Sequence, residues 1–592
     1  MKPFLTFFAL LAFAVSPLWA ARQISVGEVD YNPVGGSDYE FVELVNLGPT
    51  PFDLSGARFT NGVVYPFKAG TVVPPGGRIV VCNSKTKFAE RHGDIGSRLA
   101  GSFDGKLSDD GETLTLVDAA GKLLLEFTYG TKGAWPSRAN GLGSSLECID
   151  PSGDLDDPAN WRSSTEYGGS PGVAGIGPWR PIVINEVLSH TDPPLEDAIE
   201  LFNTTSTNVD VGGWYLSNSR AEPKKFRIPT GTVIPPRTYK VFYEQRGTGS
   251  PAGFNSFGTG RTPEFTFNSA QGDEAVLVKA DASGVIRYWV DSVSFDSAEN
   301  GVSFGRYPDL TGPLVAMSRL TSGSAVDATF PPQFLSEFRL GTGAPNALPK
   351  VGPLVFSRIM YHPLTNADEF VEVQNISATN VPLSDPLYPT NTWRIRKAID
   401  FDFPSGSQLA AGAKAIIAPI APASFRARYT VPADVQVFGP YTNVLDNAGD
   451  SLQLFKPDPP QTPPHPDAGY VPYILVEKID YLPSAPWPVA ADGMGVALQR
   501  QDPATYGNTA ANWTPDAPAT APGVTATIGP GGKLQVAFVA VANVTYVIEG
   551  RTEAASGAWA ALSTVAASGA GGGIVQAVDL TGQSRFVRVR VQ

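Results

Sequence analysis

The chain has 592 residues, 42% of them hydrophobic and 10% aromatic, and its formal net charge at pH 7 is −13. The aromatic content excludes a mainly disordered chain, and the length is too great for one hydrophobic core, so several folded domains are expected. The acidity argues against nucleic acid as a partner, because phosphate binding needs a basic surface. We therefore predict no nucleic-acid partner.

Residues 1–21 have the pattern of a secretory signal peptide. Lys2 supplies a positive start, an apolar run extends from Phe4 to Val15, and Ala20 is a small residue suited to cleavage. The run is too short to span a bilayer. The sequence therefore predicts an exported protein whose mature part has no membrane span. Its expected location is the medium, the cell surface or the periplasm.

One strand pattern occurs three times, at residues 38–46, 197–203 and 368–375. Each copy alternates apolar and polar residues with a period of two, as a half-buried strand requires. Each copy ends at an asparagine, a residue that tolerates turn conformations. Repetition at this spacing predicts three similar domains in tandem.

The first unit, residues 22–175, shows the expected order of elements most clearly. Pro-Pro-Gly-Gly at 74–77 predicts a turn before a buried strand, and Ala-Ala-Gly at 119–121 predicts a turn within a hairpin. Its short apolar runs separated by glycine and proline are typical of an all-β protein. The expected strands and connecting segments, in chain order, are 24–29, 38–46, 52–59, 65–67, 78–82, 105–118 and 123–129.

The later units follow the same order with more variation. Residues 181–349 repeat most landmarks of the first unit, and residues 351–523 keep both ends of the pattern with a divergent middle. Residues 524–592 are too short for a fourth copy. Their alternating segments predict a small β-sandwich of fibronectin-like kind.

The order of these landmarks resembles the lamin tail domain, as found in secreted bacterial proteins. The resemblance implies an immunoglobulin-like β-sandwich, usually an accessory module, with no known catalytic residues to carry over. The second unit departs from the pattern, with Phe295-Asp296 and Glu337-Phe338 near the places of the two tryptophan motifs. In the first unit the motifs are Glu40-Phe41-Val42-Glu43-Leu44, Leu54-Ser55-Gly56, Pro74-Pro75-Gly76, Trp135-Pro136, Asn160-Trp161 and Ser170-Pro171-Gly172.

The two cysteines of the chain, Cys82 and Cys148, both lie in the first unit. In an exported protein they are candidates for a disulfide. The alternative is that both are small core hydrophobes. The sequence does not decide between them, because pairing depends on geometry.

Four aspartates, Asp150, Asp154, Asp156 and Asp157, lie in one glycine-containing loop. Loops rich in carboxylates and carbonyls can hold calcium, so these residues are the candidate metal ligands and calcium is the candidate cofactor. The spacing does not meet the twelve-residue calcium-loop pattern, so a solvated acidic turn is the favoured interpretation of this loop. No other cofactor is predicted.

No catalytic constellation is found, and we predict that the protein is not an enzyme. Glu40 and Glu43 lie three positions apart on a strand, so their carboxylates point to opposite faces and cannot act together. We expect one of them to be exposed and the other to hold a neighbouring loop. Gly-x-Ser-x-Gly at 168–172 lacks the strand and helix of a nucleophile elbow and is interpreted as a closing turn.

Four tryptophans recur at matched places, which predicts core or lid residues, with a carbohydrate-stacking platform as the alternative. The favoured function is an exported, non-enzymatic binding or scaffold protein built of lamin tail domains. The alternative is a carbohydrate-binding or hydrolase-accessory extracellular protein. The expected partner is therefore an unidentified protein or polysaccharide at the cell surface. The four tryptophans are Trp135, Trp161, Trp487 and Trp513.

Overall fold

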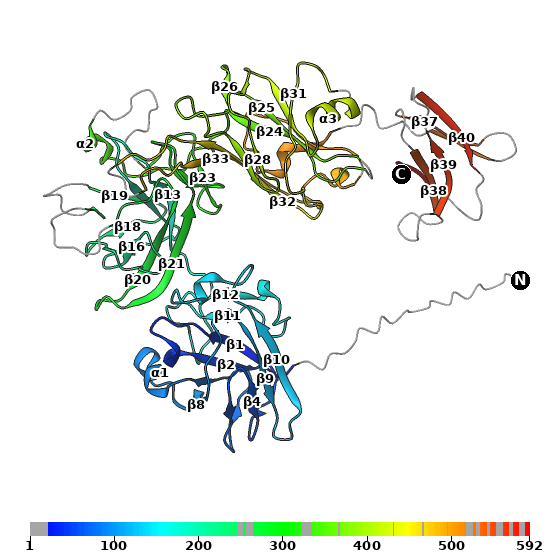
Figure 1. Ribbon diagram of the computed structural model, residues 1–592. Coiled ribbons are helices and arrows are strands. Elements are labelled where there is room, and N and C mark those ends of the chain that lie inside the picture. The colour runs from blue at the N-terminus through cyan, green and yellow to red at the C-terminus, as the bar shows by residue number, and fades with distance from the viewer. Residues whose placement is uncertain are drawn as a thin grey trace, which may run out of the picture.

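The structure is a computed structural model, in which the chain forms successive β-rich units (Figure 1). Domains 1, 2 and 3 denote residues 22–175, 181–349 and 351–523 below. The predicted signal segment, residues 1–21, lies outside the described residues. The residues described are 22–245, 253–255, 265–322, 334–364, 367–429, 431–463, 467–493, 495–516, 525–528, 533–540, 545–551, 560–566, 572–578 and 586–591.

Domain 1 is a sandwich of two sheets. The larger sheet has the strand order β12-β11-β1-β2-β7-β8 and the smaller one β10-β9-β4-β5, with β3 and β6 paired beside them. β8 runs parallel to β7, and the other pairs are antiparallel. The elements are β1 Ile24–Asp30, β2 Phe41–Asn46, β3 Phe52–Asp53, β4 Arg58–Asn61, β5 Tyr65–Pro66, β6 Val72–Val73, β7 Arg78–Cys82, α1 Lys85–His92, β8 Leu99–Ser102, β9 Glu112–Val117, β10 Leu123–Tyr129, β11 Leu146–Cys148 and β12 Trp161–Ser163.

Domain 2 repeats this architecture. Its larger sheet has the order β19-β14-β13-β22-β23 and its smaller sheet β17-β16-β20-β21, with β15 paired to β18. The elements are β13 Ile182–Leu188, β14 Ala198–Asn203, β15 Val209–Asp210, β16 Tyr215–Ser217, β17 Phe226–Arg227, β18 Val233–Ile234, β19 Tyr239–Tyr243, β20 Asp273–Ala280, β21 Ile286–Phe295, β22 Phe304–Arg306, β23 Leu314–Ala316 and α2 Leu335–Phe338.

Domain 3 matches domain 1 strand for strand. Its sheets have the orders β31-β30-β25-β24-β34-β35 and β28-β27-β32-β33, with β26 paired to β29. The elements are β24 Leu354–Met360, β25 Phe370–Asn375, β26 Val381–Pro382, β27 Arg394–Lys397, β28 Phe401–Asp402, β29 Gln408–Leu409, β30 Lys414–Ile417, α3 Pro422–Tyr429, β31 Gln436–Phe438, β32 Asp450–Pro457, β33 Tyr473–Tyr481, β34 Leu498–Arg500 and β35 Trp513–Pro515.

The C-terminal unit contains two sheets, with the orders β36-β37-β40 and β39-β38-β41. Val536, Tyr546, Ile548 and Val578 form a small core in it. The all-β class is therefore confirmed, whereas the fibronectin-like character of this unit stays a prediction. Its strands are β36 Thr525–Ile528, β37 Leu534–Ala540, β38 Thr545–Arg551, β39 Ala560–Ala566, β40 Gly572–Val578 and β41 Phe586–Val591.

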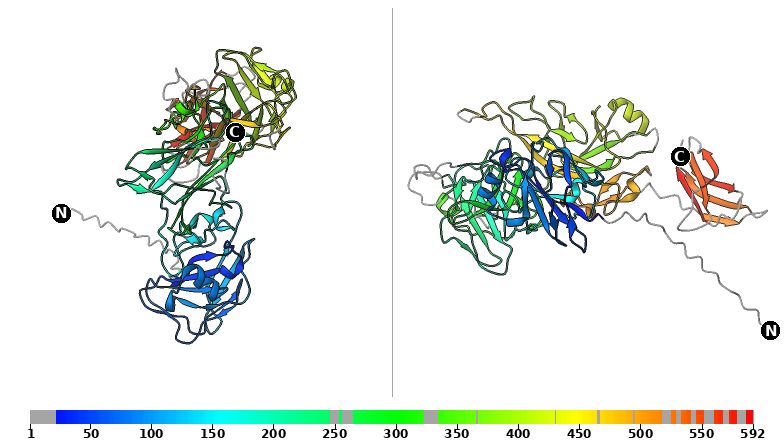
Figure 2. Two further views of the ribbon diagram at one scale, coloured as in Figure 1. Left: turned by 90° about the vertical axis from the view of Figure 1, so that its left-hand side faces the viewer. Right: turned by 90° about the horizontal axis from the view of Figure 1, so that it is seen from below.

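Each of the first three domains has its own hydrophobic core, because period-two alternation directs one row of apolar side chains from each sheet inward. In domain 1, Val26 and Leu44 of the larger sheet meet Leu114 and Phe127 of the smaller one. Separate clusters fill domains 2 and 3. Figures 1 and 2 show domain 2 lying between domains 1 and 3.

A phenylalanine from a helix covers part of the outer face of each larger sheet. In domain 1 this residue is Phe88 of α1, the helix that follows β7 in the chain. In domain 3 it is Phe425 of α3, the helix that follows the matching strand β30. In domain 2 the covering residue is Phe338 of α2, which follows β23 instead. The same apolar surface is thus buried by segments from different places in the chain, because burial matters more than the origin of the side chain.

The repeated asparagine at the end of β2, β14 and β25 is a buried clamp rather than a turn residue. Asn46, Asn203 and Asn375 are each 0% exposed. The Nδ2 of Asn203 donates to the carbonyls of Thr207 and Ile234, both at 2.8 Å, and its Oδ1 accepts the amide of the second residue after it. Asn46 and Asn375 make the same pattern, so this residue holds the following loop to the sheet.

We expect Asn203→Ala to destabilise domain 2 by about 2–4 kcal/mol, because it leaves buried carbonyl and amide groups without partners. Hydrogen exchange with mass spectrometry on the full chain measures this as lost protection of the peptides that span β14 and β18. Asn208→Ala is the matched control, since Asn208 is exposed. Equal protection in both variants would contradict the clamp.

Candidate functional site

Five charged side chains form one line across the outer face of the larger sheet of domain 1. Glu28 of β1 lies directly opposite Glu43 of β2 on one side and Glu147 of β11 on the other. Arg78 pairs with Glu43 at one end. Arg162 pairs with Glu147 at the other end, at 2.7 Å. We call Glu43, Glu28 and Glu147 the carboxylate row; two guanidinium groups thus face three carboxylates.

Residues 164–175, the closing segment, lie over this row and are held by it. Glu28 accepts the backbone amide of Ser170 at 2.9 Å, and Glu43 accepts that of Gly172 at 2.6 Å. Gly169 has φ 87°, and a Cβ there would lie 2.5 Å from Oε1 of Glu28, so only glycine fits. The row therefore anchors the backbone of the last stretch of the domain.

Burial controls the protonation of the row. Burial raises the pKa of Glu28 well above its usual range, and the nearby Glu43 carboxylate raises it further. Burial also raises the pKa of Glu43 to about 7, although the Arg78 guanidinium opposes the shift. A central carboxyl without a guanidinium of its own is most stable protonated. A proton on Glu28 therefore reduces the repulsion among the carboxylates while its oxygen still accepts the amide of Ser170.

Domain 2 keeps the two central carboxylates. Glu186 of β13 accepts the hydroxyl of Ser303 at 2.6 Å and the amide of Thr321 at 3.1 Å. Glu200 of β14 accepts the amide of Ala344 at 3.2 Å. Both carboxylates are buried, and burial raises the pKa of each.

Domain 3 reverses the central charge. Arg358 of β24 stands where the other domains carry glutamate and pairs with Asp516, while Glu372 of β25 pairs with Lys414 at 2.8 Å. Its outer row is therefore balanced by alternating charges. The buried acidic row is a property of domains 1 and 2.

The closing segment of domain 1 also joins domain 2. The backbone carbonyl of Thr165 accepts a hydrogen bond from the amide of Trp289 at 2.8 Å. The amide of Tyr167 donates to the backbone carbonyl of Arg287 at 3.0 Å. Glu166 lies opposite Tyr288 in antiparallel pairing. β21 is the edge strand of its sheet, so residues 165–167 extend the smaller sheet of domain 2 by a short strand.

Side chains reinforce this junction. The rings of Tyr167 and Trp289 stack with their centroids 6.2 Å apart. The guanidinium of Arg138 lies 5.4 Å from the Trp289 ring and donates to the carbonyl of Ser164 at 3.1 Å. Burial lowers the pKa of Arg138 to about 10. The junction therefore combines main-chain pairing with a largely buried aromatic and cationic contact.

In domain 2 and again in domain 3, a buried ion pair links the two sheets of that domain. In domain 3, Arg500 of β34 donates to Glu477 of β33 at 2.6 Å and to the carbonyl of Phe356 at 3.1 Å. In domain 2, Arg306 and Asp291 make the same pair at 2.8 Å. Sequence reasoning missed this pair, although the alternation around Glu477 places its side chain on the inward face.

Residues 19–131 and 178–296 match the family model of the lamin tail domain. The chain contains two lamin tail domains. This is a non-catalytic, immunoglobulin-like family, and the sandwich architecture of domains 1 and 2 agrees with it. No curated protein and no solved structure shows a significant match to the chain.

In the first lamin tail domain, Trp161 is a core residue and Trp135 is half-buried beside it. Trp161 is 4% exposed, and its indole donates to the carbonyl of Leu155 at 2.9 Å. In domain 3, Trp513 donates to the carbonyl of Gly507 at 2.8 Å in the same arrangement. Trp135 packs beside Trp161, and Trp487 packs beside Trp513; in each pair the ring centroids are 6.2 Å apart. Trp161, Trp487 and Trp513 are buried in the cores of their domains, so these three indoles are not accessible for stacking on a sugar.

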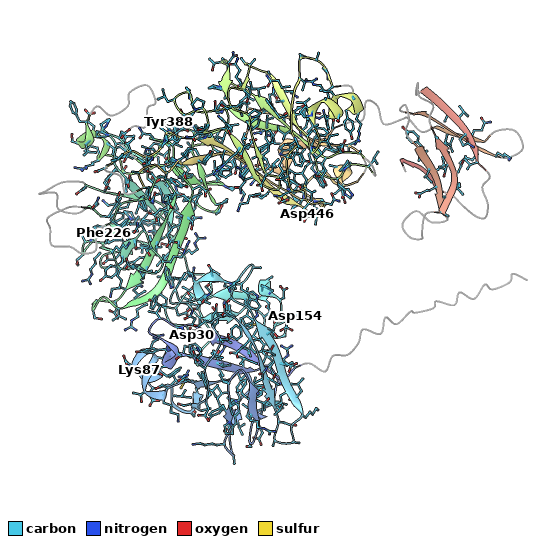
Figure 3. The ribbon with its side chains drawn as sticks, viewed as in Figure 1. Asp30, Lys87, Asp154, Phe226, Tyr388 and Asp446 are labelled. Atoms are coloured by element: carbon cyan, nitrogen blue, oxygen red, sulfur yellow. The ribbon has the colours of Figure 1, made fainter. Side chains whose placement is uncertain are left out.

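The four predicted calcium ligands of this lamin tail domain each accept hydrogen bonds from nearby backbone. Asp150 accepts the amide of Ser152 at 3.0 Å, Asp154 that of Asp156, and Asp157 that of Ala159. Asp156 also accepts the amide of Thr128 in edge strand β10 at 2.6 Å. Figure 3 shows Asp154 at the side of domain 1 away from Lys87 of α1.

Domain 3 builds the matching loop with fewer carboxylates. Asn508 accepts the amide of Asp480 at 2.8 Å, as Asp156 does for Thr128, and Asp502 accepts that of Ala504 at 2.9 Å. Within the described part of the chain, no group of three or more His, Cys, Asp or Glu is arranged to hold a metal ion. Calcium binding by this loop stays a prediction.

The candidate disulfide does not form in this structure, in which Cys82 and Cys148 are both free and buried. Cys82 lies in β7 and Cys148 in β11, and β1 and β2 separate these strands. Neighbouring strands are about 4.8 Å apart, so the cysteines are too distant to bridge. Glu147 lies opposite Glu28 in domain 1, and Gly305 lies opposite the equivalent Glu186 in domain 2. The next residue is Cys148 in domain 1 and Arg306 in domain 2, so Cys148 occupies the position of the arginine in the internal ion pair.

The expectation that one of Glu40 and Glu43 is exposed is wrong. Glu40 is 1% exposed and Glu43 0%. Glu40 accepts the amide of Leu107 at 2.8 Å, whereas Glu43 holds the closing segment. The two carboxylates do hold different loops. Both faces of β2 are covered, which period-two alternation in one strand does not reveal.

Proposed function

We propose that this chain is an exported, non-enzymatic scaffold that carries binding surfaces on domains held at fixed positions. The observation that supports it best is the pairing of residues 165–167 with β21. Main-chain pairing across a domain boundary restricts rotation far more than a flexible linker does. The predicted signal peptide supports export.

Contacts between domains 2 and 3 support the same proposal. Glu299 of domain 2 pairs with Lys350, and with Lys456 of domain 3 at 2.8 Å. The rings of Tyr307 and Tyr506 meet edge to face with centroids 5.3 Å apart. A cleft of about 250 Å³ remains between the two domains. Both junctions of domain 2 therefore involve specific side chains.

The use made of the buried polar groups supports a non-enzymatic role. Glu28 and Glu43 accept amides of the closing segment, and Glu477 neutralises Arg500. These groups hold the fold of their own domains. The carbohydrate-binding alternative loses its main support because three of the four matched tryptophans are buried and the fourth, Trp135, packs against the core. Among the described residues, no helix is long and apolar enough to cross a membrane.

The scaffold proposal is tested by the distance between domains 1 and 2. Nitroxide labels at Lys122→Cys and Ser206→Cys, both exposed positions, report this distance by double electron–electron resonance on the full chain. We expect a narrow distribution in the parent chain. Tyr167→Pro should broaden it, because proline cannot donate to Arg287 and removes the stacking ring.

Tyr167→Phe is the matched control, since it keeps both the backbone amide and the aromatic ring. A broad distribution in the parent chain would contradict fixed domains. Recovery of the chain in the cytoplasm of its native cell, or turnover of a substrate by the purified protein, would contradict the exported and non-enzymatic parts of the proposal.

A further inference from the structure

A groove of about 690 Å³ lies on domain 1, beside the edge of the larger sheet. The turn at residues 70–77 forms one wall, β8 forms another, and residues 172–174 of the closing segment form the third. We call it the β8 groove. Asn46 bonds the turn to β2, β7 pairs with β8, and Glu43 accepts the amide of Gly172, so all three segments are held to the larger sheet.

β8 lies at one edge of the larger sheet. On its inner side it pairs with β7. Leu99 and Ala100 of β8 line the groove. An edge strand offers a row of N–H and C=O groups to which an extended peptide can add as a further strand. The same chain uses this mode at residues 165–167, which add to the edge of β21.

The charge of the groove is opposite to that of the whole protein. Arg78 and Arg98 line it, and its described lining includes no acidic side chain, although the chain carries a net charge of −13. Arg78 is paired with Glu43. Arg98 is exposed and donates to the carbonyls of Ile95 at 3.2 Å and Gly172 at 2.8 Å. No carboxylate partner of Arg98 is found among the described residues.

The rim of the groove is apolar. Val72 is 49% exposed and Val173 51% exposed, on opposite walls. An occupant therefore meets a strand edge, the Arg98 guanidinium, which bonds carbonyls but has no carboxylate partner among the described residues, and two half-exposed valines. Charge complementarity selects an acidic occupant, and the strand edge selects a peptide backbone over a polysaccharide, which has no matching ladder of N–H and C=O groups.

We propose that the β8 groove binds an acidic, extended segment of a partner protein, which adds to β8 as a strand and places a carboxylate on Arg98. The segment alternates acidic and apolar residues, because successive side chains of a strand point to opposite sides. The inference rests on the proposed scaffold function, for which it names one class of partner.

The test measures fluorescence anisotropy of the labelled peptide (Glu-Val)₄ with the full chain at low salt. We expect binding of this peptide and none of (Lys-Val)₄. Arg98→Glu should weaken binding by about tenfold or more, because it replaces an attractive contact by a repulsive one. Arg98→Met removes the charge with less disturbance and should weaken binding less. Hydrogen exchange should slow at residues 99–102 when the peptide is bound.

Arg58→Glu is the matched control, since Arg58 is an exposed arginine of β4, in the other sheet of domain 1. The proposal is overturned if (Glu-Val)₄ does not bind, if the Arg58 and Arg98 variants bind it equally, or if an oligogalacturonate binds and the peptide does not. Such a failure leaves the interdomain distance unchanged. A broad distance distribution with intact peptide binding would overturn the scaffold proposal alone.

Discussion

Arg500→Leu is expected to destabilise domain 3 by about 3–5 kcal/mol, because it leaves the Glu477 carboxylate buried without its cation. The side chain of Arg500 is 0% exposed and that of Glu477 7% exposed, so water cannot replace the lost partner. The change also removes donors to the carbonyls of Phe356 and Thr505. Calorimetry of the full chain should show the domain 3 transition at a lower temperature.

Domain 1 suggests the compensating change. At the two matching positions it carries Leu125 and Cys148, both buried in the hydrophobic core. Replacing a complete buried ion pair by apolar residues is often nearly neutral, whereas removing one partner is costly. The double variant Glu477→Leu with Arg500→Cys should therefore be more stable than Arg500→Leu alone.

Arg396→Leu is the control for this experiment. Arg396 pairs with Asp402, whose side chain is 63% exposed, so the expected cost is at most about 1 kcal/mol. An equal loss for Arg396→Leu and Arg500→Leu would show that burial of the pair does not govern its contribution. A double variant less stable than the single one would contradict the comparison with domain 1.

Domain 1 is expected to lose stability as the pH rises from about 4.5 towards 7 and above. Glu28 and Glu43 keep their protons to higher pH in the folded chain than in the unfolded chain, where the ordinary pKa applies. Above that ordinary value the unfolded state ionises first and is favoured, so stability falls until the folded pKa is passed. With a folded pKa of about 7, Glu43 alone accounts for roughly 3 kcal/mol of this loss.

Glu28→Gln tests the role of the carboxylate row. The amide oxygen of glutamine still accepts the amide of Ser170, while the group no longer ionises beside Glu43 and Glu147. The slope of stability against pH should therefore become shallower, as measured by hydrogen exchange of β1 and the closing segment at several pH values.

Glu126→Gln is the control, because Glu126 is an exposed residue of β10. It should leave the slope unchanged. If Glu28→Gln also leaves the slope unchanged, the buried row does not control the pH dependence. An increase of stability between about pH 5 and pH 7 in the parent chain would contradict the direction argued from burial.

Local patterns in the sequence were enough to determine the repeated strands and the fold class. The period-two pattern predicted a strand over 38–46, and β2 covers Phe41–Asn46 within it. The Pro-Pro-Gly-Gly turn precedes β7 as expected. These features depend on side chains close in the chain, which alternation and turn chemistry describe directly. The matched tryptophans were predicted to be core or lid residues, and Trp161, Trp487 and Trp513 are core residues, with Trp135 packed against the core.

Tertiary structure alone decided what covers each strand. Glu43 alternates as an exposed residue would, yet the closing segment, more than a hundred residues later, buries it. Cys82 and Cys148 are separated because β1 and β2 lie between their strands, and Phe338 replaces Phe88 from a different part of the chain. Alternation sets which face of a strand a side chain occupies. Only the packing of distant segments determines whether that face meets water, a carboxylate or another domain.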